Sequence, residues 1–305
     1  MIAARDPTSL RNDETLTLAW NAVPQRLALQ QHVSHASFIP TKRGEQMTQF
    51  KRKVILGLAL ATTAVLAACG GGDDGIDDRV GLSKPAVRVI HAVTAGPNVD
   101  VLQNGALTPL QNIPYKTVSG YFDVSTGNNL FAFNLTGTST QIGSTTVDAH
   151  TGHKYTVIAL PGTTSADVAQ IDDPYGKGLL DTSARVRTFN ASINAQNVDV
   201  YLTTPAVDLN SVQPNMASVQ YKSAVPASGQ DSQYVDGGTY RLRITTAGTK
   251  TVIFDSGALT IDKNADWLIT TIPADGFGAV VPNRIKVLVA QSNTSNTTAQ
   301  ELVSQ

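Results

Sequence analysis

Short stretches of the chain alternate between apolar and polar residues with a period of two, which is typical of half-buried β-strands. Residues 240–244 show it most clearly, with three apolar residues on one face and two arginines on the other. Residues 155–160 and 251–254 are nearly continuous runs of β-forming residues, which suits central strands. Trp267 lies in a similar run and is expected in the core. Because long helical patterns are absent, the pattern predicts an all-β fold.

Turn-forming residues separate these stretches at short intervals. They include Asn104-Gly105, Ala247-Gly248 and the segments 95–98, 126–129 and 236–238. About seven short strands spaced in this way predict an immunoglobulin-like β-sandwich. The Cys–Trp–Cys core of immunoglobulin domains is absent, so the expected likeness is one of architecture only.

The chain contains an internal duplication. Residues 87–92 are echoed by residues 186–191, and the Asn-Val-Asp-Val sequence at 98–101 recurs at 197–200. Both pairs are offset by 99 residues. This period is too long for a solenoid repeat of about 20–50 residues and has the size of a small domain. We therefore expect two tandem β-sandwich domains.

The duplication sets the predicted domain boundaries. We expect one sandwich at residues 84–176 and a second at 182–292, joined by a linker at 177–181. The sequence before and within the linker is rich in Asp, Gly and Pro, which favours turns. Residues 293–305 are predicted to form a disordered tail.

A secretory signal precedes the predicted domains. Lys51, Arg52 and Lys53 lead into an apolar run of about 13 residues at 54–66, within the roughly 7–15 residues of a signal core. A membrane-spanning helix needs about 20 residues, so we predict no transmembrane helix.

The signal lies unusually far from the first residue. A short basic start follows Met47 directly, so we predict a signal peptide at residues 47–68. Residues 1–46 contain scattered prolines and acidic residues without sustained periodicity. We interpret them as a start-site error, and the alternative is a genuine, disordered extension.

The signal ends at Leu66-Ala67-Ala68-Cys69, which contains the single cysteine of the chain. This sequence resembles the lipobox of bacterial lipoproteins. The resemblance implies cleavage between Ala68 and Cys69, a diacylglycerol on the Cys69 thiol, and acylation of the new amino group. Several acyl chains give stable membrane anchoring. Gly70 rather than aspartate follows Cys69, which in enterobacterial lipoproteins favours the outer over the inner membrane.

Residues 69–83 connect this cysteine to the first predicted domain. Three glycines follow Cys69, and four aspartates lie within residues 73–78. Glycine makes a chain flexible and like charges extend it, so we predict a flexible tether. The aspartates lack the spacing of a calcium-binding loop and its distant glutamate.

Each copy also carries a set of short motifs. In the first copy they lie at residues 87–92, 97–101, 114–116 and 119–121. In the second copy they lie at residues 184–187, 197–201 and 238–243. These motifs resemble the bacterial domain of unknown function 4397 (DUF4397). The resemblance implies secreted or surface β-domains, often in tandem and often on lipoproteins, and it implies no reaction.

Composition and motif searches narrow the functional classes. A net charge of −1 with 15% charged residues lacks the excess of positive charge that is typical of nucleic-acid-binding proteins. Gly-x-Ser-x-Gly, phosphate-loop and dinucleotide motifs are absent. His150 and His153 could seed a metal site, but such sites need three or four ligands. We therefore predict no catalytic residue, no metal and no cofactor.

His91 is the strongest single candidate for a functional residue, because it ends a predicted strand within the shared motif. It could bind a ligand or metal, or it could hydrogen-bond within the following turn. The second copy has Asn190 here, which retains hydrogen bonding but loses imidazole chemistry, so we favour the structural role. Asp100 and Asp199 occupy equivalent positions and are predicted to accept backbone hydrogen bonds near turns.

Two repeated aromatic–cationic pairs join His91 as candidate ligand contacts. These pairs are Tyr115-Lys116 and Tyr221-Lys222. A tyrosine ring with a neighbouring lysine could stack on a sugar or a peptide. Packing at a core or an edge is the competing interpretation.

We predict a non-enzymatic lipoprotein of the cell envelope with a binding, adhesion or structural role. Its expected partners are the membrane, through the lipid anchor, and a glycan or another envelope protein. Tandem modules raise avidity for repetitive partners. One alternative is an envelope hydrolase that uses His91 and nearby carboxylates. Another is a periplasmic carrier of a small ligand, bound near the loops at 94–97 and 193–196.

Overall fold

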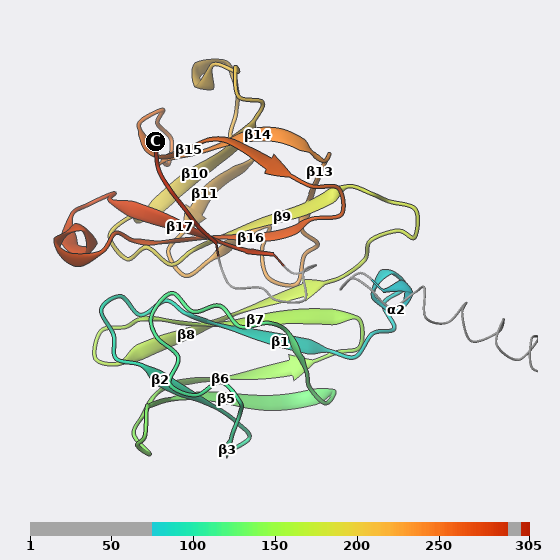
Figure 1. The fold of residues 1–305 in the computed structure, drawn as a ribbon, viewed down its shortest axis with the longest axis vertical. Coiled ribbons are helices and arrows are strands. Elements are labelled where there is room, and N and C mark those ends of the chain that lie inside the picture. Colours follow the sequence, from blue (N-terminus) through green and yellow to red (C-terminus); the bar gives the residue numbers. More distant parts are fainter. Residues whose placement is uncertain (1–74, 292–299) are drawn as a thin grey trace, which may run out of the picture. The chain divides into compact units, whose positions relative to one another are not determined.

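The computed structural model describes residues 75–291 and 300–305, most of them in β-strands (Figure 1). Within these ranges the helical elements are α2 (Ile76–Arg79), η1 (Leu209–Ser211) and η2 (Gly276–Val280). The prediction of an all-β fold is confirmed. No helix in the described ranges is long and apolar enough to cross a membrane.

Several predictions fall on parts of the chain that the structure does not describe. Residues 1–46, the predicted signal peptide at 47–68, and Cys69 lie outside the described residues. The same holds for most of the predicted tail, up to residue 299. These assignments therefore stay predictions from the sequence.

The first half of the described chain forms two facing sheets, which we call the first sandwich (residues 86–174). Their strand orders are β4-β1-β7-β8 and β3-β2-β5-β6. The bounds are β1 (Ala86–His91), β2 (Val99–Gln103), β3 (Ala106–Leu107), β4 (Phe122–Asp123), β5 (Gly127–Leu135), β6 (Gln141–Ala149), β7 (His153–Pro161) and β8 (Ala166–Pro174). Strands β1 and β7 run parallel, and the other paired strands of this sandwich are antiparallel.

The alternation along the strands produces the core of the first sandwich. Val87 and Val89 of β1 pack with Val157 of β7 and with Phe131 and Phe133 of β5. All five side chains are fully buried. Residues two apart on a strand face the same side, so one face of each sheet forms this core.

The second half forms another pair of sheets, the second sandwich (residues 184–302). Their strand orders are β12-β9-β16-β17-β18, with β13 also paired to β9, and β11-β10-β14-β15. The bounds are β9 (Ala184–Asn190), β10 (Asn197–Thr203), β11 (Met216–Gln220), β12 (Ala224–Val225), β13 (Gln233–Val235), β14 (Gly238–Thr246), β15 (Val252–Ile261), β16 (Asp266–Pro273), β17 (Ile285–Gln291) and β18 (Gln300–Leu302).

The second sandwich repeats the topology of the first. Parallel pairing matches Val87 with Tyr155 in the first and Val186 with Trp267 in the second. Trp267 therefore occupies the position of Tyr155, and its burial in the core is confirmed. This strand order differs from the ABED and CFG sheets of immunoglobulin domains, so the likeness is one of layered architecture.

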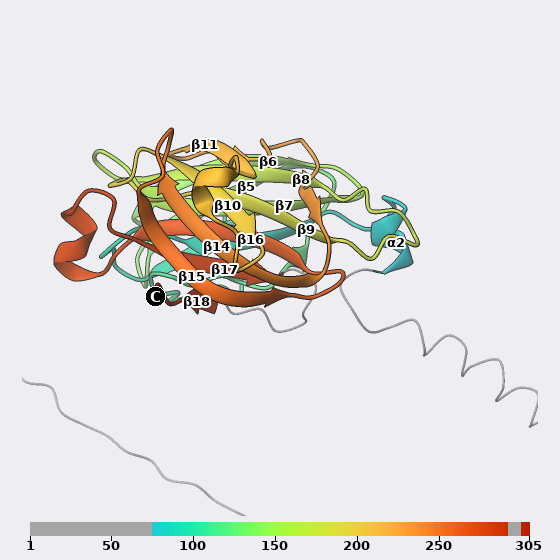
Figure 2. The same ribbon diagram turned by 90° about the horizontal axis from the view of Figure 1, so that it is seen from above.

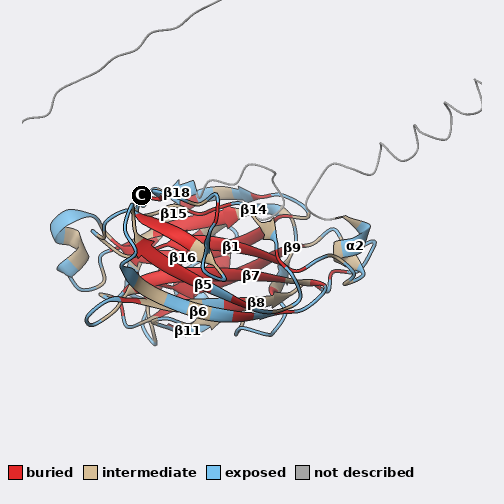
Figure 3. Cartoon of the chain, turned by 90° about the horizontal axis from the view of Figure 1, so that it is seen from below, coloured by how far each residue is buried: buried red, intermediate tan, exposed pale blue. Residues whose placement is uncertain are grey.

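The outer faces of the β1–β7 and β9–β16 sheets pack against each other, so that the sandwiches are stacked (Figures 1 and 2). Ile90, Ile158 and Leu160 of the first sandwich join Phe189 and Leu268 of the second in one buried apolar cluster. Every residue of β1, β9 and β16 is buried (Figure 3). Covering on both faces explains why residues 154–160 of β7 are buried without interruption.

Two segments predicted to be a tether and a linker are held against the fold. The Arg79 guanidinium donates to the carbonyl oxygens of Gly178, Leu179 and Asp181 at 3.0–3.1 Å. Lys177 is fully buried within the predicted linker. The prediction of a flexible tether is therefore wrong for residues 75–83, because Arg79 binds three carbonyl groups that a loose segment would leave to water.

The C-terminal residues also differ from the prediction of a disordered tail. Strand β18 pairs antiparallel with β17, matching Leu302 with Val287 and Gln300 with Val289. The Gln305 amide then donates to the Asp255 carbonyl of β15 at 2.9 Å. The prediction is wrong for residues 300–305, because they cover the edge of β17 that would otherwise be left unpaired.

Leu160→Ala tests whether the two sandwiches depend on their shared contact. Removing this fully buried side chain should lower the free energy of unfolding by about 2–5 kcal/mol. Urea denaturation followed by Trp267 fluorescence should detect the loss, although Trp267 lies in the other sandwich. Leu130→Ala, at an exposed position of β5, is the control and should change stability by about 0.5 kcal/mol or less. An unshifted Trp267 transition in Leu160→Ala would show that the sandwiches unfold independently.

Candidate functional site

His91 ends β1 and holds the loop that follows it. Its Nε2 lies 3.0 Å from the carbonyl oxygen of Pro97, and the amide of Val93 donates to its Nδ1 at 3.4 Å. The ring is fully buried. These contacts require a neutral imidazole that donates with Nε2 and accepts with Nδ1.

Asn190 ends β9 and holds the corresponding loop of the second sandwich. Its side-chain amide donates to the carbonyl oxygen of Gln196 at 3.3 Å, and its oxygen accepts from the amide of Ser192 at 2.9 Å. These partners stand 99 residues after those of His91. Asparagine can replace histidine here because both side chains can donate to one of these backbone groups and accept from the other. Both residues thus fasten a loop.

Burial lowers the pKa of His91 below its ordinary value of 6.5, and the hydrogen bond to Pro97 opposes this only in part. A proton on Nδ1 would face the Val93 N–H and break the existing bond. Among the described residues, no carboxylate is hydrogen-bonded to His91. The arrangement keeps the ring neutral and engaged with the backbone.

Asp100 joins two turns of the first sandwich. Its carboxylate accepts from the amides of Asn112 at 2.7 Å and Gly137 at 2.9 Å, and these bonds lower its pKa. Asp199 makes the same kind of bridge in the second sandwich, with bonds of 2.7 and 2.8 Å to backbone amides. Each of these repeated aspartates therefore connects backbone turns.

Tyr221 and Lys222 extend from the second sandwich to the first. The hydroxyl of Tyr221 donates to the carbonyl oxygen of Pro161 at 2.8 Å, and Lys222 forms an ion pair with Asp167. Burial, together with the nearby Asp167 charge, raises the pKa of Tyr221 to about 12. The hydroxyl therefore stays protonated and donates at neutral pH.

Tyr115 and Lys116 make the reciprocal contact. The hydroxyl of Tyr115 lies 3.4 Å from the carbonyl oxygen of Pro273, and Lys116 Nζ lies 2.8 Å from Asp275. Pro161 ends β7 and Pro273 ends β16, which are equivalent strands. The two Tyr–Lys pairs thus form a self-complementary contact, as in an isologous dimer interface. We call these contacts the reciprocal clasps.

The structure brings only some of the five candidate ligand contacts together. The rings of His91 and Tyr115 meet edge to face with their centroids 6.4 Å apart. Lys116 adjoins them in sequence, but its amine points to the second sandwich. Tyr221 and Lys222 occupy the equivalent positions and contact the first sandwich. The two Tyr–Lys pairs thus connect the sandwiches, whereas His91 fastens a loop within its own sandwich.

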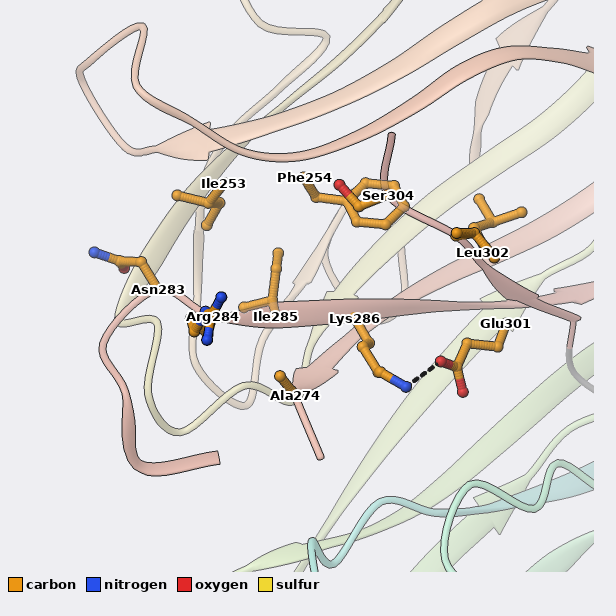
Figure 4. A pocket seen from close by; sticks show the side chains of 11 residues that line it. Ile253, Phe254, Ala274, Asn283, Arg284, Ile285, Lys286, Glu301, Leu302 and Ser304 are labelled. Carbon is orange, nitrogen blue, oxygen red and sulfur yellow. Dashed lines mark hydrogen bonds and ion pairs between the residues drawn. The ribbon is translucent and has the colours of Figure 1, made fainter. Parts of the chain in front are cut away.

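A groove of about 510 Å³ lies in the second sandwich beside β15, β17 and β18 (Figure 4). Phe254 and Leu302 contribute apolar surface to it. At one end, Lys286 Nζ lies 2.5 Å from Glu301 and 2.6 Å from Asp275. Hydrogen bonds from lysines lower the pKa of Asp275. The charges of Lys286, Glu301 and Asp275 are therefore mutually paired, and Arg284 adds a further cationic group to the lining.

The first sandwich has a more apolar groove at its edge, between β3 and β4, of about 460 Å³. Its lining includes Leu107, Leu110, Tyr121 and Phe122. The Leu107 side chain is 60% exposed. The Arg88 guanidinium lies 4.9 Å from the centre of the Tyr121 ring and fixes one wall by a cation–π contact. We call this feature the edge groove.

A buried charge cluster centres on Arg185, whose side chain is wholly buried. Its guanidinium lies 2.7 Å from Asp173, 2.7 Å from Asp231 and 3.5 Å from Asp266. Burial alone would lower the pKa of Arg185, but the three carboxylates raise it above the ordinary value. Sequence reasoning missed this cluster. Its only signal is the placement of two arginines, Arg185 and Arg187, between the apolar residues that begin this strand.

The two neighbouring histidines each pair with an aspartate. His153 Nδ1 lies 2.7 Å from Asp172, and His150 Nε2 lies 3.5 Å from Asp148. Their rings meet edge to face at 5.8 Å. Within the described ranges, no group of three or more His, Cys, Asp or Glu residues is placed to hold a metal ion.

Comparison with known families identifies one domain. A DUF4397 domain, whose function is unknown, is found at residues 85–201. The match spans the first sandwich and continues through β9 into β10 of the second. A search of curated proteins found no match to the chain.

The loop-fastening role predicts which substitutions of His91 the fold tolerates. His91→Asn should retain the fold, because Asn190 already makes the equivalent bonds. His91→Leu should lower the free energy of unfolding by about 1–3 kcal/mol, because Pro97 and Val93 lose their buried partner. Urea denaturation at pH 8 measures both variants. Equal losses in the two variants would contradict this role.

Wild type and His91→Asn should differ in the pH dependence of their stability. The folded-state pKa of His91 lies below the unfolded value of about 6.5, so the unfolded chain binds more protons in that interval. The stability due to neutral His91 is complete above pH 6.5 and is lost as the pH falls toward the folded pKa. Wild type should therefore lose more stability than His91→Asn between pH 7 and pH 5, whereas parallel curves would show that His91 is not held neutral.

Proposed function

We propose that the chain is a lipid-anchored protein of the bacterial cell envelope with a non-catalytic binding or structural role. The fold would present two stacked sandwiches at the end of a short anchor. We place the anchor in the outer membrane, on the basis of Gly70 following Cys69.

The engagement of the motif residues with the backbone is the observation that supports a non-catalytic role. Both ring nitrogens of His91 have backbone partners, and Asp100 accepts from two backbone amides. A hydrolase needs a general base within hydrogen-bond reach of the proton it removes. In this geometry, His91 would have to give up its loop contacts before it could act.

Support for anchoring comes from the sequence at Leu66-Ala67-Ala68-Cys69 and the basic, apolar signal before it. The diacylglycerol and the amide-linked acyl chain expected of this motif would hold the protein durably at a membrane. Lipidation also removes the single cysteine from redox chemistry.

The edge groove is the surface that we assign to a partner. Strands β3 and β4 are two-residue edge strands, each paired on one side within the described sheets. An exposed strand edge next to an apolar hollow suits an extended peptide, which can add backbone hydrogen bonds and insert alternate side chains. We therefore propose an extended segment of another envelope protein as its occupant.

A small-ligand carrier is the second candidate function. Ile193, Asn194 and Gln196 line a hollow of about 480 Å³ together with Thr246 and Asn283. This volume lies within the roughly 300–1,000 Å³ of small-molecule sites. Its location at the loop 193–196 is the observation that favours a carrier.

Cys69→Ser tests the anchoring. The substitution should move the protein from the membrane fraction to the soluble fraction, because no acyl chain can be attached. Gly71→Ser, two residues further on, is the matched control and should stay with the membrane. Fractionation measures membrane association, and intact-mass spectrometry measures whether acyl chains are attached. Membrane retention of Cys69→Ser would refute lipid anchoring.

Leu107→Asp tests the edge groove. A charge at the groove should reduce capture of its partner from envelope extract by at least about tenfold, the equivalent of losing about 1.4 kcal/mol of apolar contact. Leu130→Asp, at another exposed leucine of this sandwich, is the matched control. Both changes are made in the soluble Cys69→Ser background, and quantitative mass spectrometry measures capture. Equal capture by both variants would exclude the edge groove as the binding site of the captured partner.

A further inference from the structure

Exposed apolar side chains gather where the chain enters the described fold. Ile76 is 62% exposed and Leu82 is 69% exposed, and both lie on the segment that follows Gly75. Leu179 is 56% exposed and Leu180 is 95% exposed, in the connection between β8 and β9. We call these four residues the anchor face. A cluster of large apolar side chains in water indicates an interaction surface.

Defined contacts hold the two parts of the anchor face together. Arg79 of α2 donates to the carbonyl oxygens of Leu179 and Gly178, and it also bonds to Asn264 at 3.1 Å. The amide of Gly152 donates to the carbonyl oxygen of Ser83 at 2.8 Å. Figures 1 and 2 show α2 beside the connection that leads into β9. The apolar residues therefore project from a structured base.

Two lysines that lie beneath the anchor face are buried, whereas its leucines are exposed. Lys154 is buried beneath α2, where its amine pairs with Asp78 at 3.4 Å. Lys177 is buried and donates to Asn264 at 2.8 Å. Lys154 and Lys177 thus point inward and are paired, whereas Leu180 is almost completely exposed.

The length of chain before α2 limits how far the anchor face can lie from a lipidated Cys69. Six peptide units separate Cys69 from Gly75. Six units of polypeptide can span at most about 22 Å. A bilayer that holds Cys69 would therefore be within direct reach of α2.

We propose that the anchor face docks on the lipid surface in which Cys69 is anchored, with Leu179 and Leu180 inserted at the headgroup–acyl boundary. This inference rests on the proposed lipid anchoring. It adds that the sandwiches have a fixed orientation, with the α2 end against the membrane and the other end directed away from it.

The shape of the anchor face favours lipid over a protein partner. Leu180 protrudes, whereas a protein interface requires a complementary hollow to receive it. A lipid surface accepts a protruding side chain without a preformed pocket. Attachment at Cys69 would also make docking intramolecular, so that weak insertion is sufficient.

The charges nearby indicate which lipid surface is suitable. Asp77 is exposed on α2, and Asp73 and Asp74 precede it in the chain. These carboxylates would be repelled by anionic headgroups. Docking should therefore be stronger on zwitterionic phosphatidylcholine than on vesicles that contain phosphatidylglycerol.

A fluorescent label at position 180 tests the proposal in the lipidated, full-length protein. Cys69 is the single cysteine and its thiol is occupied by lipid, so Leu180→Cys introduces one reactive thiol. Phe277→Cys is the matched control, because Phe277 is 93% exposed on η2. The η2 turn, the red-orange coil in Figures 1 and 2, lies at the opposite end from α2. Both proteins are reconstituted in phosphatidylcholine vesicles.

Insertion by about 5–10 Å should expose the label at 180 to a nitroxide on the lipid acyl chains and shield it from aqueous iodide. We expect at least about fivefold stronger lipid quenching at 180 than at 277, and the reverse for iodide. Leu179→Ser in the Leu180→Cys protein should reduce lipid quenching. Equal quenching at both positions, in protein that floats with the vesicles, would overturn the docking and leave anchoring intact. Wild type that does not float would overturn anchoring and, with it, this inference.

Discussion

The apolar contact between the two sandwiches is the constraint on which the rest of the structure depends. Strands β1, β7, β9 and β16 each lie between the core of their own sandwich and this shared cluster. Exposure of their outer faces to water would leave side chains such as Ile90 and Phe189 uncovered. The sheets that contain the parallel strand pairs are therefore the ones that meet, as expected for parallel strands, which are usually covered on both faces.

Polar contacts give this apolar interface its specificity. Apolar burial is non-directional, whereas the reciprocal clasps attach each Tyr–Lys pair to the end of the equivalent strand in the other sandwich. The duplication makes such reciprocity possible, because one motif can meet its own copy. Loops fastened by His91 and Asn190 precede the clasps in each copy and hold the start of the next strand. Histidine and asparagine each bond to the equivalent loop residues, so the copies could diverge here without losing that contact.

Local sequence properties predicted the β-strands, the duplication and the burial of Trp267, because period and spacing are visible in a single segment. The partners of Tyr115 and Tyr221 could not be predicted, since they depend on how two folded sandwiches meet. Arg185 was missed because its three carboxylates come from separate segments of the chain. Residues 300–305 lacked a strand pattern, and their order comes from the open edge of β17 that they cover.

The two copies differ in the length of one edge segment, and their equivalent buried arginines, Arg88 and Arg187, have different partners there. Arg187 donates to the carbonyl oxygens of Pro226, Ala227 and Gln230, all within the longer segment at 213–233. This segment folds over the second sandwich because the buried guanidinium needs those acceptors. In the first sandwich Arg88 is bonded to Thr156 and lies over Tyr121, and the corresponding segment is shorter. The equivalent arginines of the two copies thus have different partners, and in the first sandwich the segment that contains Tyr121 also lines the edge groove.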